Sequence, residues 1–208
     1  MESAIKDVLK QYAVRAEKER AEIEGGKELN ADDLLLWVGP ESGALLNALA
    51  KGARATNILE LGTSYGYSTI WLAEAAKANG GKVTTCELSK AKHDYARTSL
   101  AATGLLEHVE LRTGNALEII PTVPDGIDFV LVDLWKNLYV PCLELFFPKL
   151  KPGAVIVADN MLRPKQARAD ALAYRRAVRA KPGITSVLLP IGSGLEVSRL
   201  VGPHDEAL

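Results

Sequence analysis

Short apolar segments alternate with helix-forming segments along most of the chain, and this alternation restricts the fold more than any other feature. The apolar segments are hydrophobic on both sides, which is typical of strands in a parallel sheet covered on both faces. Strands that alternate with helices in this way predict an α/β fold. The expected strands are residues 57–61, 82–88, 109–112, 127–133, 154–158, 186–189 and 195–200, and the expected helices are residues 3–24, 40–52, 68–79, 89–103, 116–120, 139–147 and 166–181.

The last two expected strands are joined by a short connection, Gly192-Ser193-Gly194, which suits an antiparallel hairpin. We therefore expect a Rossmann-like, doubly wound sheet of seven strands, with about five parallel strands, the C-terminal antiparallel hairpin and helices on both faces. Residues 1–208 are expected to form a single domain, in which residues 1–24 are an N-terminal helical extension. The apolar stripe of that helix could cap the domain or pack against a second subunit; it comprises Ile5, Val8, Leu9 and Tyr12.

The charge and composition of the chain give no support to a nucleic-acid or membrane partner. Its 208 residues include 25 basic and 26 acidic side chains, so the formal net charge is -1 and attracts neither nucleic acid nor a membrane surface. No apolar run approaches the roughly 20 residues that span a bilayer, and the first residues do not resemble a signal peptide. Cys86 and Cys142 lie among apolar neighbours, which indicates buried free thiols. We expect a cytoplasmic protein that binds a small molecule, with no nucleic-acid or membrane partner.

A glycine turn follows the first strand, in the segment Leu61-Gly62-Thr63-Ser64-Tyr65-Gly66-Tyr67-Ser68. Ligands of doubly wound sheets bind where parallel strands end, and glycines let the backbone approach them closely. The GxxxG spacing differs from the GxGxxG of a dinucleotide site, and no GK[ST] follows as in a phosphate loop. Taken alone, the turn could equally be a purely structural tight turn.

An acidic residue at the end of the second strand narrows the choice of ligand. The two oxygens of Glu87 can accept hydrogen bonds from both ribose hydroxyls, although the residue could also simply place negative charge at a helix start. Together with the glycine turn, Glu87 indicates a nucleoside ligand without a pyrophosphate, and S-adenosylmethionine (SAM) fits that description. Glu60 could face the amino group and sulfonium of such a ligand. Gly114-Asn115 could cradle its adenine ring, or could be only a turn and a helix cap.

Three oxygen-bearing side chains follow the fourth and fifth strands. Asp133 ends one strand, and Asp159 and Asn160 end the next. Carboxylate and amide oxygens suit Mg²⁺ or a similar ion, whereas each Asp taken singly could only cap a turn. Lys136 lies three residues after Asp133, where it could serve as a general base or could be an ordinary solvated lysine.

These motifs resemble the metal-dependent, small-molecule O-methyltransferases of the catechol and caffeoyl-CoA type. The resemblance runs from about Val38 to Val201, and its motifs occur in family order at family spacing. The motifs are Gly39-Pro40-Glu41, Leu59-Glu60-Leu61-Gly62 with Gly66-Tyr67-Ser68, Cys86-Glu87, Gly114-Asn115-Ala116, Asp133-Leu134-Trp135-Lys136 with Tyr139, Ala158-Asp159-Asn160, and the terminal stretch 189–195.

The resemblance implies a role for each matching position. Asp133, Asp159 and Asn160 would hold a divalent metal, usually Mg²⁺, and Lys136 would be the general base, acting beside Asp133. The bacterial relatives often form homodimers, and the resemblance extends that expectation to this chain. The expected SAM-binding residues are Val38, Glu60, Gly62, Thr63, Ser64, Tyr67, Ser68, Glu87, Leu88, Asn115, Ala116, Asp133 and Trp135.

The expected reaction is metal-assisted transfer of a methyl group from SAM to a hydroxyl of a catechol-like or phenolic acceptor. Two alternatives remain open at this point: a metal-independent small-molecule methyltransferase, and a non-catalytic SAM-binding oligomeric module. The chain departs from the catechol enzymes at Leu134, where they have a histidine that contacts the cofactor. It also departs in the short stretch 161–169, which lacks tryptophan. In relatives, the loop at this position helps shape the acceptor pocket. Its Arg163, Lys165 and Arg168 could meet an anionic substrate or could be a solvated helix start.

Overall fold

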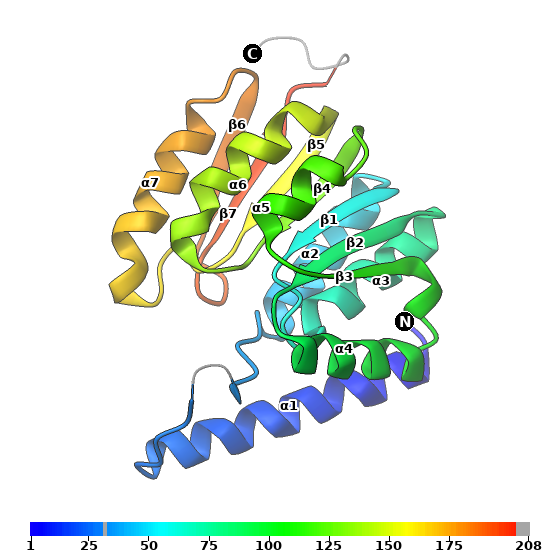
Figure 1. Cartoon of the computed structure of the whole chain (residues 1–208), viewed down its shortest axis with the longest axis vertical. Coiled ribbons are helices and arrows are strands. Elements are labelled where there is room, and N and C mark those ends of the chain that lie inside the picture. Colours follow the sequence, from blue (N-terminus) through cyan, green and yellow to red (C-terminus); the bar gives the residue numbers. More distant parts are fainter. Residues whose placement is uncertain (31–32, 203–208) are drawn as a thin grey trace.

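A single mixed sheet of seven strands organises the protein, as the computed structural model of residues 1–30 and 33–202 shows (Figure 1). The strand order is β3-β2-β1-β4-β5-β7-β6, with β1 to β5 parallel and β7 antiparallel to both of its neighbours. The predicted doubly wound sheet with its C-terminal hairpin is therefore confirmed. The strands are β1 (Asn57–Leu61), β2 (Lys82–Glu87), β3 (Val109–Thr113), β4 (Ile127–Val132), β5 (Leu150–Ala158), β6 (Ile184–Leu189) and β7 (Leu195–Leu200).

The chain reverses its direction of winding between β1 and β4, which are neighbours in the sheet although far apart in sequence. At such a point the connections that leave the two strands diverge to opposite faces, and a crevice opens beyond the carboxyl ends of the strands. The glycine turn leaves β1 and the Asp133 segment leaves β4, so both predicted motifs lie at this crevice.

Of the seven α-helices in the described residues, α2 to α7 lie on the two faces of the sheet and α1 packs against α3 and α4 (Figure 1). One apolar core joins the sheet to the first four helices, and a second joins it to the last three. Successive residues of β4 serve the two cores in turn, because side chains alternate across a strand: Phe129 and Leu131 belong to the first core, and Val130 and Val132 to the second. The helices are α1 (Ser3–Glu24), α2 (Pro40–Gly52), α3 (Tyr67–Asn79), α4 (Lys90–Ala102), α5 (Ala116–Ile119), α6 (Tyr139–Phe146) and α7 (Arg168–Arg179).

The N-terminal helix α1 lies along α4 (Figure 1). Its apolar residues Ile5, Val8 and Tyr12 are buried in the first core of the same chain. The stripe therefore caps the domain, which was one of the two alternatives that the sequence left open. No helix of the described residues is long and apolar enough to cross a membrane.

The observed element bounds differ from the expected ones mainly at β5. This strand begins at Leu150 rather than at residue 154, because Leu150 pairs with Ile127 before a register shift along the β4–β5 ladder. The expected cap of α4 is present, since the Ser89 side chain accepts a hydrogen bond from the Lys92 amide. Cys86 and Cys142 are both free and buried, as expected.

One buried carboxylate ties the start of β1 to its neighbours. Asp128 on β4 accepts hydrogen bonds from the amides of Thr56 (2.9 Å) and Asn57 (3.0 Å), and from the Thr56 hydroxyl (3.1 Å). Its fourth partner is the ammonium group of Lys151 on β5, at 2.7 Å. Three strands thus converge on one side chain, at the end of the sheet opposite the crevice.

Replacing Asp128 with alanine should destabilise the fold by about 3 kcal/mol, because it leaves two backbone amides and a lysine without their partner. Chemical denaturation measures this loss. The matched control is Asp125→Ala, which removes an 82% exposed side chain that pairs with Lys149 and should cost less than about 1 kcal/mol. Equal losses in the two variants would contradict the role given to Asp128.

Candidate functional site

The glycine turn is held against the backbone of two neighbouring strands. Gly62 has a φ of +102°, and a side chain there would collide with the backbone of Asp133, so this position requires glycine. The amides of Gly62 and Thr63 both donate to the carbonyl of Cys86, at 3.3 and 3.1 Å. Gly66 has a φ of +91° and packs against Ala96 of α4. The turn is therefore packed tightly between β2, β4 and α4.

Glu87 at the end of β2 is fixed in place by backbone amides. One carboxylate oxygen accepts from the Ser64 amide at 2.8 Å, and the other accepts from the Ser89 amide at 2.9 Å. Each oxygen keeps a further lone pair for a ligand. The carboxylate thus bridges the glycine turn and the start of α4 and remains able to accept from two neighbouring donors.

The ends of β4 and β5 bring the predicted acidic residues together. The β1–β4–β5 pairing continues past the strands, because the Asp133 amide donates to the Leu61 carbonyl (2.9 Å) and the Asp159 amide to the Val132 carbonyl (3.1 Å). Asn160 follows with a φ of +61°, and its amide donates to a carboxylate oxygen of Asp159 at 2.7 Å.

Lys136 and Tyr139 form a polar network beside these carboxylates. The Lys136 ammonium donates to the Leu134 carbonyl (2.9 Å) and the Tyr139 hydroxyl (2.8 Å), and lies 3.5 Å from a carboxylate oxygen of Asp133. The Tyr139 hydroxyl in turn donates to the Asp159 carbonyl at 3.2 Å. Burial raises the pKa of Tyr139 well above its usual range, so its phenol stays neutral and acts as a donor.

The two aspartates lack enough positive charge around them to ionise readily. Burial raises the pKa of Asp133, and the nearby charge of Asp159 raises it further, although Lys136 acts in the opposite direction. Burial also raises the pKa of Asp159. An additional cation at this position would stabilise both ionised carboxylates. Within residues 1–30 and 33–202, no group of three or more His, Cys, Asp or Glu could hold a metal ion, and Asn160 is the residue that adds an amide oxygen to the two carboxylates in this cavity.

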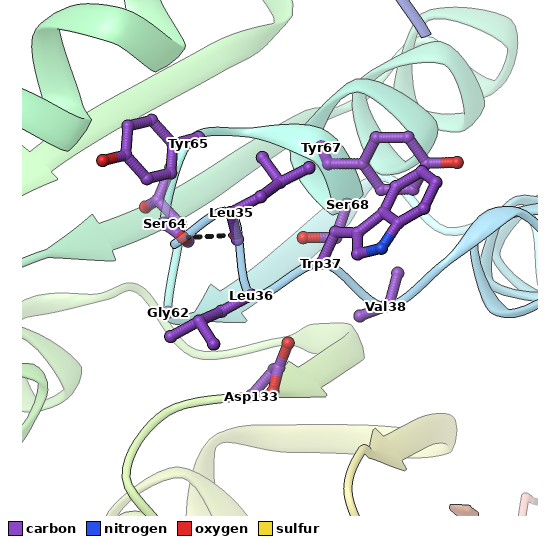
Figure 2. Close-up of a pocket in the computed structure, with 11 residues that line it drawn as sticks. Leu35, Leu36, Trp37, Val38, Gly62, Ser64, Tyr65, Tyr67, Ser68 and Asp133 are labelled. Atoms are coloured by element: carbon purple, nitrogen blue, oxygen red, sulfur yellow. Dashed lines mark hydrogen bonds between the residues drawn. The ribbon is translucent and has the colours of Figure 1, made fainter. Parts of the chain in front are cut away.

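A cavity of about 740 Å³ joins the glycine turn to the acidic strand ends. A smaller recess beside it lies under the segment 35–38, where Figure 2 shows Leu36 beside Gly62 and Asp133 across from them. Of the residues predicted from the sequence, the large cavity is lined by Gly62, Ser64, Glu87, Leu88, Asn115, Ala116, Asp133, Trp135, Lys136, Asp159 and Asn160, and the recess also by Val38, Thr63, Tyr67 and Ser68.

Glu60 is the one predicted site residue that lines neither space. Its carboxyl group is fully buried beneath the turn, where it accepts from the hydroxyls of Ser68 (2.7 Å) and Thr69 (2.5 Å) at the start of α3. Burial raises its pKa to about 7, although these hydroxyls act in the opposite direction. In this structure Glu60 therefore supports the turn from below, and Ser68 lies between it and the recess.

Sequence reasoning missed several residues that line the cavity. Leu36 and Trp37 belong to the segment before α2 and carry no recognisable motif; their only signal is their position just before Gly39-Pro40. Lys92 of α4 is buried although charged, and a helical lysine gives no sign of this in the sequence. Pro164 and Ser193 come from the two loops at the far side, which pair through their backbones.

Comparison with known proteins identifies similar chains. A family model described as a methyltransferase domain matches residues 59–161. The catechol O-methyltransferase of Niastella koreensis is 38% identical over 130 residues, which is 61% of this chain and 58% of that protein, so the match spans less than two thirds of that relative. The catechol O-methyltransferase of Mycobacterium tuberculosis is 36% identical over 148 residues, 68% of this chain and 67% of that protein. A crystal structure of the O-methyltransferase from Bacillus cereus in complex with SAH matches with a TM-score of 0.76 and 29% identity, over 96% of this chain and 91% of that one.

The buried Glu60 should make stability depend on pH. Its pKa is about 7 in the fold, against an ordinary value of 4.5, so between these values the folded state keeps a proton that the unfolded state has lost. Stability from this group is therefore full at low pH and falls by up to about 3 kcal/mol as the pH rises through 7. Glu60→Gln cannot titrate, and its stability relative to the unsubstituted protein should rise by that amount between about pH 5 and about pH 8. Denaturation curves at several pH values measure the difference, and parallel pH profiles for the two proteins would contradict the assignment.

Proposed function

This chain belongs to the SAM-dependent O-methyltransferase family of the catechol and caffeoyl-CoA type, and we propose that it transfers the methyl group of SAM to a hydroxyl of a small phenolic acceptor. The single observation that carries the proposal is the cavity itself. One continuous space of about 740 Å³ contains Glu87 at one end and the Asp133, Lys136 and Asp159 group at the other. A carboxylate suited to ribose hydroxyls and a group suited to proton transfer thus line the same cavity.

The cofactor would lie along the carboxyl ends of β1 and β2. Glu87 would accept from the two ribose hydroxyls, and Asn115 and Ala116 would border the adenine with Leu88 and Trp135. The amino-acid end of SAM would lie at the mouth of the recess of Figure 2, where the Ser68 hydroxyl and the backbone of Gly62 face the segment 35–38. The methyl group would then point toward Asp133 and Lys136.

The donor atoms at the carboxyl ends of β4 and β5 suit a divalent cation. Asp133 and Asp159 are paired, poorly neutralised carboxylates, and Asn160 adds an amide oxygen, which together form the hard oxygen set that Mg²⁺ prefers. We propose that these three residues hold such a cation. When bound, it would supply positive charge at the acceptor's oxygens and so lower the pKa of the reacting hydroxyl.

In its neutral amine form, Lys136 would receive the proton of the acceptor hydroxyl and become an ammonium, while that oxygen attacks the methyl carbon of SAM. The new bond joins oxygen to the methyl carbon, and the bond from that carbon to sulfur breaks with its electrons staying on sulfur. The Leu134 carbonyl and the Tyr139 hydroxyl, 2.9 and 2.8 Å from the Lys136 nitrogen, would keep it aimed at the reacting oxygen. Most of the rate gain would come from this alignment, which removes several kcal/mol of orientational cost.

The acceptor wall would be formed by Leu138, Pro164, Ala167 and Ser193, which line the cavity beyond Asn160. These side chains are apolar or small, as expected around a phenolic ring. Arg163, Lys165 and Arg168 are exposed on the same stretch, so both interpretations given to them from the sequence stand. The expected homodimer also stays a prediction, although the apolar stripe of α1 is already used within one chain; light scattering in solution tests it.

Glu87→Gln should weaken SAM binding about tenfold, because a neutral amide accepts hydrogen bonds from ribose hydroxyls less strongly than a carboxylate does. Isothermal titration calorimetry with SAM alone, without acceptor, measures the dissociation constant. Glu110→Gln is the matched control, since Glu110 on β3 pairs with Arg112 away from the cavity and should leave binding unchanged. Equal affinities in the Glu87 and Glu110 variants would show that Glu87 does not hold the cofactor.

Asp159→Asn should lower the rate of catechol methylation at least about a hundredfold, since it removes one charge from the metal site. EDTA should have the same effect on the unsubstituted protein, and added Mg²⁺ should restore its activity. SAM binding by calorimetry is the control and should persist in both cases. Full activity in EDTA would contradict the metal mechanism and favour a metal-independent methyltransferase. SAM binding without turnover on any of a panel of catechols would instead favour a non-catalytic SAM-binding module.

A further inference from the structure

Three polar side chains of α1 lie on one side of the helix and point back to the crevice. Tyr12, Arg15 and Glu19 are spaced three and four residues apart, which places them on the same helix face. Tyr12 also belongs to the apolar stripe that anchors α1 to the core, whereas Arg15 and Glu19 lie outside that stripe. Their partners are instead the two segments that wall the cofactor space.

The first of these segments is the glycine turn. The Tyr12 hydroxyl donates to the Tyr65 carbonyl at 2.5 Å, and its ring meets the edge of Tyr67 at 5.5 Å between ring centres. The Arg15 guanidinium lies over the Tyr65 ring, 3.9 Å from its centre, which is a close cation–π contact. Both Tyr65 and Tyr67 line the recess shown in Figure 2.

The second segment is the stretch 33–38, which covers the recess from the other side. Arg15 donates to the Asp33 carbonyl at 2.8 Å, and Glu19 accepts from the Leu35 amide at 2.9 Å. Arg15 and Glu19 also pair with each other at 2.7 Å. The next residues along this stretch, Leu36 to Val38, line the recess, with the side chain of Leu36 next to Gly62 (Figure 2).

Two hydrogen bonds join the glycine turn directly to the stretch 33–38. The Tyr65 hydroxyl donates to the Asp33 carbonyl at 3.3 Å, and the Ser64 hydroxyl donates to the Leu35 carbonyl at 3.2 Å. Arg15 therefore contacts both members of the first of these bonds, with its guanidinium on the Tyr65 ring and on the Asp33 carbonyl. Its planar group can make several directed contacts at once, which a lysine ammonium could not reproduce.

We propose that α1 is a working part of the cofactor site, in which Arg15 and Glu19 are positioning residues that set the separation of the 33–38 segment from the glycine turn. The inference rests on the proposed function, since it takes SAM to be the ligand of this recess. Fixing both walls before binding reduces the ordering that the ligand must impose, which raises affinity. Arg15 and Glu19 do not line the cavity, so they act through the residues that do.

The chain offers a matched control on the same helix. Arg20 and Glu24 form a second pair with the same i, i+4 spacing, and their side chains are 78% and 66% exposed, against 26% and 18% for Arg15 and Glu19. Arg20→Ala thus removes an ion pair with the same spacing on the same helix, but one that is far more exposed than the Arg15–Glu19 pair. Any effect specific to Arg15→Ala cannot come from helix propensity or from the loss of one surface ion pair.

The experiment compares SAM binding by calorimetry with hydrogen exchange of the amides in 33–38, in the unsubstituted protein and in the Arg15→Ala, Arg15→Lys and Arg20→Ala variants. We expect the dissociation constant for SAM to rise about tenfold in Arg15→Ala, with faster exchange at Leu35 and Leu36. Arg15→Lys should recover little of this affinity, and Arg20→Ala should match the unsubstituted protein in both measurements.

Equal SAM affinity in Arg15→Ala and Arg20→Ala would overturn the inference. If Arg15→Ala does not fold, Glu19→Gln provides the same test, because it keeps the helix face but weakens the bond to the Leu35 amide. Failure of the proposed function looks different, since the unsubstituted protein itself would then bind no SAM. A rise in the Michaelis constant for SAM without a change in that for the acceptor would further separate positioning from general loss of structure.

Discussion

The continuation of strand pairing beyond the ends of β1, β4 and β5 is the constraint on which the site depends. The amides of Asp133 and Asp159 still bond to neighbouring strands, so the backbone that carries both carboxylates is as fixed as the sheet. The same edge forces Gly62 against Asp133, which joins the cofactor turn to the acidic group. Rigid backbone fixes both the glycine turn and the acidic strand ends. The proposed methyl donor and the proposed proton acceptor are therefore held at a constant separation, as catalysis by alignment requires.

The same part of the sheet carries an electrostatic cost, because it buries three carboxyl groups. Glu60, Asp133 and Asp159 lie on three adjacent strands, and burial raises the pKa of each. A protein selected for stability alone would not gather three carboxylates there, since each resists ionisation in the fold. In the proposed function a bound cation offsets the cost at Asp133 and Asp159, whereas Glu60 is stabilised by neighbouring hydroxyl groups.

The sequence predicted what depends on local pattern. Alternating apolar and helical segments were enough for the sheet, and glycine spacing with acidic strand ends was enough to bring Gly62, Glu87, Asp133 and Asp159 to one cavity. It could not predict that Glu60 turns beneath the glycine turn, because a strand residue adjacent to a turn can face either side. It also gave no sign of the segment 35–38 or of the polar face of α1, whose importance comes from contacts between residues 16 to 53 positions apart in the chain.

The far side of the cavity is built in a different manner from the cofactor side. Residues 161–163 are held by backbone bonds to Ser193 and Gly194 of the β6–β7 connection, and their side chains take no part in those bonds. Exchange of the exposed Leu162 and Arg163 side chains would therefore leave these backbone bonds in place, whereas Met161 is buried in the second core. The proposed cofactor side thus depends on side-chain identity, as at Gly62 and Glu87, whereas the opposite wall is held largely by its backbone. Exchanges at exposed positions of that wall would change the proposed acceptor pocket without altering the proposed cofactor side.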